Sequence, residues 1–204
     1  MIIWLASYPK SGNTLLRSIL ATYFFSKEGE FKFDYLYKIE QFPSISNFEN
    51  IGVDVLDEKK VFNNFIQAQK FINKEKNKVK FIKTHSSLSR INDSNFTDLE
   101  NTMGAVYIVR DPRNVIKSYA HHYDLSLDEA ADVMIDQTRW LVKTDKMFKT
   151  FLSSWSINYN SWKQLGDKVL FVKYEDLINK KKTTLIKIFK FFQKLGMQNL
   201  NLDM

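Results

Sequence analysis

Short apolar runs alternate along the chain with longer stretches whose apolar residues recur at helical spacing. Runs of five or six mostly apolar residues between polar segments predict buried strands. Buried strands separated by helices indicate a parallel sheet that is covered on both faces. We therefore predict an α/β protein with three layers, α/β/α, around a central parallel sheet. The predicted strands cover residues 2–6, 79–84, 105–109 and 168–173.

Helical spacing marks most of the remaining chain. Asp111 and Pro112 predict a helix start, because an aspartate caps the first N–H groups and a proline fits the first turn. Residues 26–57 lack clear periodicity and are rich in aromatic side chains. This stretch is either a functional loop or lid, or a hydrophobic cluster beneath a loop, and both interpretations stay open. The predicted helices cover residues 15–25, 59–74, 112–124, 127–144, 148–165 and 181–195.

A polar loop, residues 7–14, joins the first predicted strand to the first predicted helix and contains Lys10 and Gly12. This order is suited to phosphate, because N–H groups at a helix start and a lysine ammonium both attract an anion. The loop is not a Walker A motif, since its glycine follows the lysine. The alternative is an ordinary strand-to-helix turn capped by Asn13 or Thr14.

Polar residues follow the ends of all four predicted strands: Lys10, His85, Arg110 and Tyr174. In parallel α/β sheets, ligands bind beyond the carboxyl ends of the strands. The sequence therefore predicts that these side chains share one site.

Arg110 and Ser118 suit a second anion contact. Ser118 is seven residues after Asp111, which returns it to nearly the same helix face. A guanidinium and a hydroxyl can hold one anion between them. Alternatively, Arg110 pairs with Asp111 and Ser118 packs within the helix.

Length and composition predict one domain over residues 1–204, with 44% hydrophobic and 15% aromatic residues that argue against disorder. The absence of cysteine excludes disulfides and thiolate metal sites and favours a cytoplasmic protein. We expect no signal peptide and no membrane span. The formal net charge of +7 gathers partly in residues 74–78 and 180–182, which we interpret as solvated faces. Nucleic acid is not an expected partner, because aromatics interleaved with arginine are not evident.

Four motifs together resemble those of sulfotransferases that use 3′-phosphoadenosine 5′-phosphosulfate (PAPS). The resemblance covers nearly all of residues 1–195 and implies a P-loop NTPase-like fold. It implies that the chain transfers a sulfuryl group from PAPS to a hydroxyl acceptor without a metal. The motifs are YPKSG (8–12), KTH (83–85), RDPRNVIKS (110–118) and YEDL (174–177).

The resemblance also implies roles for the matched residues. His85 is expected to be the general base, Lys10 to stabilise the departing phosphate oxygen, and Lys83 to lie at the transferred group. An imidazole with a pKa near 6.5 is largely neutral at pH 7, which suits a base. His121 and His122 stay unassigned, either structural or on the acceptor side. The expected PAPS-binding residues are Lys10, Ser11, Gly12, Asn13 and Thr14 at the 5′-phosphosulfate, Arg110 and Ser118 at the 3′-phosphate, and Tyr174 at the adenine.

Two departures from the family pattern leave alternatives open. Leu15 stands where the animal cytosolic branch has a tryptophan that packs on the adenine, so part of the base contact is expected to differ. That branch also has a late Arg-Lys-Gly segment at the 3′-phosphate, and nothing comparable follows Leu195. The sequence is then a shortened form, a bacterial-type variant with other phosphate contacts, or a product that lacks a C-terminal segment.

The rival functions are a P-loop nucleotide kinase-like phosphotransferase and a non-catalytic protein that binds a nucleotide or a partner. The kinase would need Mg²⁺ carboxylates and a glycine before the lysine, and neither is evident. The expected acceptor, a small molecule, glycan or lipid with a hydroxyl group, binds against residues 26–57. Oligomeric state is not predicted.

Overall fold

A four-stranded parallel sheet forms the centre of the computed structural model, which describes residues 1–74, 78–91, 93–198 and 200. The strand order is β2-β1-β5-β8. All neighbouring pairs are parallel. The predicted class and the four predicted strands are confirmed, with β5 starting three residues earlier than expected. The strands are β1 (Ile2–Ser7), β2 (Lys80–Thr84), β5 (Thr102–Val109) and β8 (Val169–Lys173).

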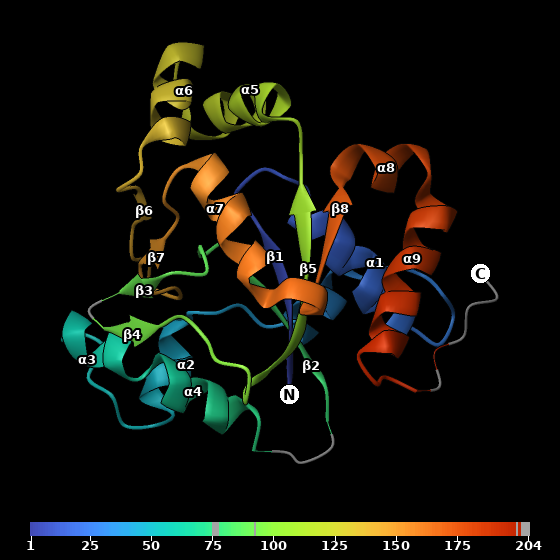
Figure 1. Ribbon diagram of the computed structural model, residues 1–204, viewed down its shortest axis with the longest axis horizontal. Coiled ribbons are helices and arrows are strands. Elements are labelled where there is room, and N and C mark those ends of the chain that lie inside the picture. Colours follow the sequence, from blue (N-terminus) through green and yellow to red (C-terminus); the bar gives the residue numbers. More distant parts are fainter. Residues whose placement is uncertain (75–77, 92, 199, 201–204) are drawn as a thin grey trace.

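Successive side chains of β1 point to opposite faces of the sheet and into two separate cores. Ile3 and Leu5 face the core beneath α1 (Asn13–Phe25) and α9 (Lys181–Lys194). Trp4 faces the other core, under α3 (Glu58–Asn63), α4 (Phe65–Ile72) and the 3₁₀ helix η2 (Trp162–Lys168). Helices thus cover both faces, which gives the three predicted layers (Figure 1).

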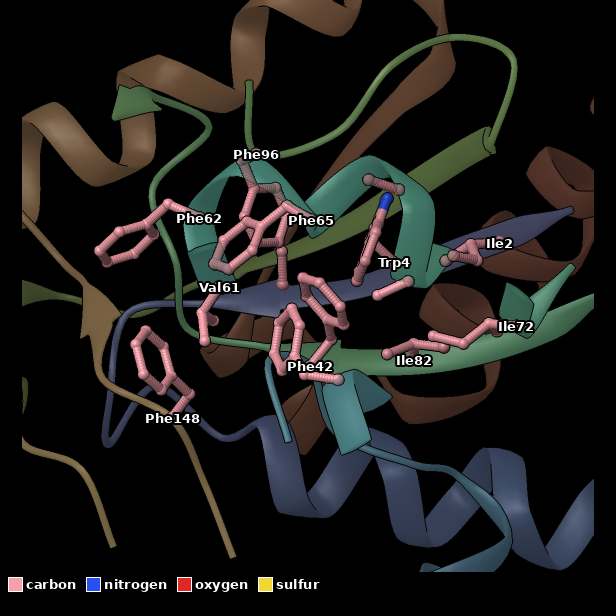
Figure 2. Close-up of a cluster of buried hydrophobic side chains, with 14 of the residues drawn as sticks. Ile2, Trp4, Phe42, Val61, Phe62, Phe65, Ile72, Ile82, Phe96 and Phe148 are labelled. Carbon is pink, nitrogen blue, oxygen red and sulfur yellow. The ribbon is translucent and has the colours of Figure 1, made fainter. Parts of the chain in front are cut away.

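The second core is strongly aromatic. The rings of Trp4, Phe42 and Phe96 contact one another in a triangle, with the Trp4 centroid 5.8 Å from that of Phe42 and 5.1 Å from that of Phe96, and Phe65 completes the group (Figure 2). Phe42 and Phe48 belong to the irregular segment 26–57, so this part of the segment is a hydrophobic cluster, as one of the two interpretations held. In the same segment, Tyr37 is exposed on the 3₁₀ helix η1 (Phe33–Lys38).

Three helix predictions hold closely. The predicted helix 15–25 is α1, which starts two residues earlier, at Asn13. α5 (Pro112–Tyr123) starts where expected, and the Asp111 carboxylate accepts the N–H of Arg113 at 2.9 Å. α5 and α6 (Leu127–Ile135) lie beyond the carboxyl end of β5 (Figure 1). The last predicted helix, 181–195, corresponds to α9, which ends one residue earlier, at Lys194.

Three helix predictions are wrong in extent. The predicted helix 59–74 divides into α3 and α4 at Asn64, whose side-chain amide donates to the Lys60 carbonyl at 2.9 Å and competes with the helix pattern. The predicted helix 127–144 ends at Ile135, because the Asp136 carboxylate accepts the Thr138 N–H at 2.7 Å and forms a turn. The predicted helix 148–165 starts only at Trp155, where Ser154 caps α7 (Trp155–Ser161).

Between α6 and α7, residues 140–151 form a hairpin-like pair, β6 (Trp140–Leu141) antiparallel to β7 (Thr150–Phe151). We call residues 140–151 the β6–β7 segment. The other elements are α2 (Ile45–Glu49), β3 (Arg90–Ile91), β4 (Ser94–Asn95) and α8 (Tyr174–Asn179).

The described helices include none that is long and apolar enough to span a membrane. Residues 75–77 of the lysine-rich stretch 74–78 lie outside the described residues, as do residues 201–204 of the predicted domain. A single domain over the whole chain stays a prediction.

Candidate active site

The polar loop after β1 is held in an unusual backbone shape. Lys10 and Gly12 have positive φ angles of 64° and 97°. The Asn13 side-chain amide donates to the Leu5 carbonyl at 2.9 Å and to the Ser7 hydroxyl at 3.1 Å, which ties the start of α1 back to β1. The N-cap of α1 is Gly12 and no side chain caps it, so the alternative of a turn capped by Asn13 or Thr14 is wrong. The first N–H groups of α1 therefore remain available to an anion.

Arg110 and Tyr174 pack against this loop. A Cβ added to Gly12 would lie 2.2 Å from the Tyr174 ring, so only glycine allows this close approach. The Arg110 guanidinium lies over the same ring, 4.6 Å from its centroid, and Nη1 donates to the Lys10 carbonyl at 3.0 Å. The alternative pairing of Arg110 with Asp111 is wrong, because the Asp111 carboxylate pairs with Arg113.

All of the predicted site residues except Ser11 and Ser118 meet around a cavity of about 490 Å³, which we call the polar cavity. His122, Tyr123 and Leu141 also line it. His122 was left open as structural or on the acceptor side, whereas Tyr123 and Leu141 had no predicted role. His122 and Tyr123 reach the cavity because they end α5. The lining residues are Pro9, Lys10, Gly12, Asn13, Thr14, Lys83, His85, Arg110, His122, Tyr123, Leu141 and Tyr174.

Four buried polar atoms in or beside the loop lack a partner among the described residues: Tyr8 Oη, Ser11 Oγ, Asn13 Oδ1 and Arg110 Nε. Buried polar groups are normally hydrogen-bonded, so unpaired ones call for a ligand or water. A hydroxyl and a guanidinium N–H are donors, which suits an anionic ligand such as PAPS. Ser118, by contrast, is not among the lining residues of the polar cavity, and its contact with the 3′-phosphate stays a prediction.

His85 has a defined tautomer. Its Nδ1 lies 2.7 Å from the Ser7 carbonyl oxygen, and because a carbonyl only accepts, Nδ1 carries the proton. Nε2 therefore has a free lone pair. Burial and the nearby Lys83 cation lower the pKa of His85 to about 3, so the ring is neutral at pH 7. The hydrogen bond to Ser7 opposes this shift without cancelling it.

Lys83 lies two residues before His85 and projects from the end of β2. Its Nζ donates to the Gln41 side-chain oxygen at 2.8 Å. Burial, and then the cationic Arg17, lower the pKa of Lys83 to about 8. Lys83 is thus mostly charged at neutral pH but loses its proton more readily than an exposed lysine.

A second cavity of about 260 Å³, the apolar cavity, adjoins the polar one and shares Lys83, His85, Tyr123 and Leu141 with it. Residues 26–57, against which the acceptor was expected to bind, contribute only Gln41 and Phe42 to the lining of this cavity. Most of the remaining wall comes from the β6–β7 segment, which was predicted to be largely helical. The other lining residues are Thr84, Val142, Thr144, Met147, Phe148 and Thr150.

Within the described part of the chain, no group of three histidine, aspartate or glutamate side chains is placed to hold a metal ion.

Known proteins resemble this chain in sequence and in fold. A mouse protein, sulfotransferase 1 family member D1, is 26% identical over 202 residues, which cover 94% of this chain and 59% of the mouse protein. The mouse sulfotransferase SULT7A1, solved in complex with PAP, superposes with a TM-score of 0.57 at 20% identity, over 97% of this chain and 60% of that one. Retinol dehydratase, solved with androsterone and the inactive cofactor PAP, superposes with a TM-score of 0.57 at 17% identity, over 99% of this chain and 61% of that one.

The chain therefore spans about three fifths of the length of these relatives. The structural matches support the same fold. The family model described as the sulfotransferase domain matches residues 2–200, nearly the whole sequence. On this match the chain belongs to the sulfotransferase domain family.

Proposed function

We propose that this protein transfers a sulfuryl group from PAPS to a hydroxyl group of a small-molecule acceptor. The observation that carries the proposal is the position of His85. Its neutral ring, with Nδ1 bonded to Ser7, lines both the polar and the apolar cavity. A base at this boundary reaches an acceptor on one side and a donor on the other.

On the donor side, Lys10, the N–H groups of residues 11–14 and Ser11 Oγ are proposed to hold the 5′-phosphosulfate. Arg110 and Ser118 are proposed to hold the 3′-phosphate, with Tyr174 near the adenine. The unpaired donors around the loop support this assignment. When bound, PAPS supplies the sulfuryl group.

On the acceptor side, His85 Nε2 takes the proton of the acceptor hydroxyl, and the freed oxygen bonds to sulfur as the sulfur–oxygen bond to phosphate breaks. Lys10 neutralises the charge that develops on the departing phosphate oxygen. Lys83 lies beside His85 and stabilises the transferring group. The negative donor also raises the low pKa of His85, which strengthens it as a base in the complex.

The acceptor itself is inferred from the apolar cavity, whose wall includes Phe42, Met147 and Phe148. An uncharged alcohol or phenol suits such a wall better than a charged compound. Retinol dehydratase has been solved with androsterone or retinol, which are apolar alcohols, and this supports an apolar small-molecule acceptor over a glycan.

The first test is calorimetric titration with adenosine 3′,5′-bisphosphate, AMP and ATP·Mg²⁺, followed by transfer assays with PAPS. We expect the bisphosphate to bind most tightly. Arg110→Met is expected to weaken the bisphosphate by about tenfold or more and to leave AMP nearly unchanged, because a charge-assisted bond to phosphate is lost. Arg113→Met is the matched control, since Arg113 is exposed and pairs only with Asp111.

Equal affinity for all three nucleotides would remove the 3′-phosphate role of Arg110. Binding of the bisphosphate without transfer to any of a panel of alcohols and phenols would favour the non-catalytic alternative. Transfer of phosphate from ATP·Mg²⁺ would favour the kinase-like one.

A further inference from the structure

Gln41 is fixed beside Lys83 by the backbone. The two residues form a parallel bridge at the free edge of β2. The Phe42 N–H donates to the Lys83 carbonyl at 2.9 Å, and the Lys83 N–H donates to the Glu40 carbonyl at 2.8 Å. The position of Gln41 along β2 is therefore set by main-chain bonds on both sides of it.

Arg17 of α1 secures the chain just before this bridge. Its buried guanidinium donates through Nη2 to the Ile39 carbonyl at 2.7 Å and to the Leu36 carbonyl at 2.8 Å. Charge-assisted bonds to carbonyls are among the stronger hydrogen bonds in proteins. The short segment 39–42 is thus held from α1 on one side and from β2 on the other.

The side chains of Gln41 and Lys83 then meet at the apolar cavity, which both of them line. The amide oxygen of Gln41 accepts one of the three N–H groups of Lys83, at 2.8 Å. A free lysine side chain has several rotatable bonds, and holding it in one geometry costs conformational entropy. A contact made before the substrates bind reduces that cost at the moment of reaction.

The charge of Gln41 matters as much as its position. The charged or titratable side chains that line the two cavities with Lys83, or act on its charge, are Lys10, Arg17, His85, Arg110, His122, Tyr123 and Tyr174. No carboxylate lines either cavity among the described residues. A glutamate in place of Gln41 would pair with Lys83 and weaken its attraction for an anionic donor, whereas the neutral amide leaves its full charge available.

We propose that Gln41 is a positioning residue, which aims the Lys83 ammonium at the transferring group and leaves the charge of that ammonium uncompensated. This inference rests on the proposed sulfuryl transfer and adds to it a residue outside the four motifs. Gln41 acts through Lys83 and is not itself expected to bond to the donor.

The test compares Gln41→Glu and Gln41→Leu with the wild type. The same substitutions at Gln164 serve as matched controls, because Gln164 is exposed and its amide only donates to the Leu88 carbonyl. The first readout is the pKa of Lys83, which is measured by NMR titration of the whole chain with ¹³C-labelled lysine side chains. The Lys83 signal is assigned by its loss in Lys83→Met. The second is kcat, KM and the pH profile of PAPS-dependent transfer.

In Gln41→Glu we expect the pKa of Lys83 to rise by about one unit or more, because a carboxylate favours the charged lysine. The alkaline fall of kcat/KM should move to higher pH by the same amount. We also expect kcat to fall by about tenfold, since the new carboxylate opposes the anionic donor. In Gln41→Leu, the pKa of Lys83 should fall and kcat should fall, with little change in the acceptor KM.

A Lys83 titration that is the same in wild type, Gln41→Glu and Gln41→Leu would overturn the inference, as would unchanged kcat and pH profile in both variants. These outcomes are distinct from failure of the proposed function. A wild-type chain that transfers nothing from PAPS would refute sulfuryl transfer and with it this role of Gln41. Wild-type transfer with indifferent Gln41 variants would refute the role of Gln41 alone.

Discussion

The two cavities that meet at Lys83 and His85 have walls of different origin. The polar cavity takes five of its lining residues from the short stretch 9–14, and the rest from strand ends, from the end of α5 and from Leu141. The apolar cavity is lined largely by the β6–β7 segment and by Gln41 and Phe42. This pair lies far from the β6–β7 segment in the sequence. One wall is therefore encoded locally, and the other is assembled by tertiary contacts.

The two walls are also held by different kinds of contact. The polar loop follows β1, whose backbone is paired on both sides, and Asn13 ties α1 to that strand. The β6–β7 segment has only a two-residue ladder of its own. The segment is also held by main-chain bonds to loops, from the Phe148 N–H to the Pro43 carbonyl and from the Ile45 N–H to the Lys146 carbonyl, and by the buried Phe148 ring in the aromatic core. Lysines add outer contacts: Lys149 pairs with Glu58 and lies over the Trp140 ring, and Lys143 donates to the Val55 carbonyl. Because the two walls are held through different neighbours, we expect donor binding and acceptor binding to respond separately to mutation.

The largest expected effect comes from the boundary between the cavities. His85→Ala is expected to lower kcat by about 10²–10⁴-fold, the usual contribution of a general base, while the affinity for adenosine 3′,5′-bisphosphate stays within about threefold. Transfer assays and calorimetry measure the two quantities. His121→Ala is the control, because His121 is exposed and lines neither cavity. Retained turnover in His85→Ala would rule out its role as the base.

A change confined to the wall of the polar cavity should lower both the affinity for the nucleotide and the stability of the fold. Gly12→Ala places a Cβ 2.2 Å from the Tyr174 ring at a φ of +97°. The left-handed backbone alone costs about 1–2 kcal/mol, and the clash adds to it. Gly29→Ala is a matched control, since Gly29 also has a positive φ but nothing lies within 4 Å of its added Cβ. Thermal unfolding and bisphosphate titration should both separate the two variants, and equal behaviour would argue against the packing of Tyr174 on the loop.

The pH profile separates the two groups at the boundary. Since the pKa of His85 is lowered to about 3, we expect kcat/KM to show no fall at an ordinary histidine pKa as pH drops from 7 to 5. Since the pKa of Lys83 is lowered to about 8, its charge is lost as pH rises through that value. At pH 9, kcat/KM should be about tenfold lower than at pH 7, because most Lys83 side chains are then uncharged. An aliphatic alcohol acceptor avoids a second titration, and Lys83→Arg should abolish the alkaline fall.

The smallest expected effect lies on the acceptor wall. Met147 lines the apolar cavity but not the polar one. Met147→Ala is expected to raise the acceptor KM by roughly threefold to tenfold through lost apolar contact, with bisphosphate affinity unchanged. Met147→Leu conserves volume and should behave like the wild type. An effect of Met147→Ala on the nucleotide as large as that on the acceptor would mean that the walls are not independent.

The features that could be predicted from the sequence are those that depend on local residue patterns. The four strands and the loop residues Lys10 and Gly12 were predictable because apolar runs and short motifs carry their own information. His85 and Arg110 were placed correctly at strand ends for the same reason. The β6–β7 segment was predicted to be mainly helical, because its apolar residues have helical spacing. The Asp136 turn and the pairing of Trp140 with Phe151 prevail over that pattern.

Gln41 had no sequence signal at all. Its contact with Lys83 depends on segment 39–42 lying along β2, a pairing across some forty residues that no local pattern encodes. Likewise, Tyr123 and Leu141 join the cavities only because α5 and the β6–β7 segment pack over the sheet edge. The catalytic and PAPS-binding roles of all the predicted site residues stay predictions.

Because β1 is buried along its whole length and lies between β2 and β5, its amides can exchange hydrogen with solvent only when most of the sheet opens. The β6–β7 ladder is two residue pairs long and belongs to a separate two-stranded sheet, so we expect its amides to exchange without separation of β1 from its neighbours. The polar loop is therefore attached to one of the parts of the molecule expected to exchange most slowly, whereas the apolar cavity is lined partly by a segment expected to exchange faster. In the proposed reaction, the donor then binds beside a part of the fold that stays closed, and the acceptor binds beside a part that opens locally.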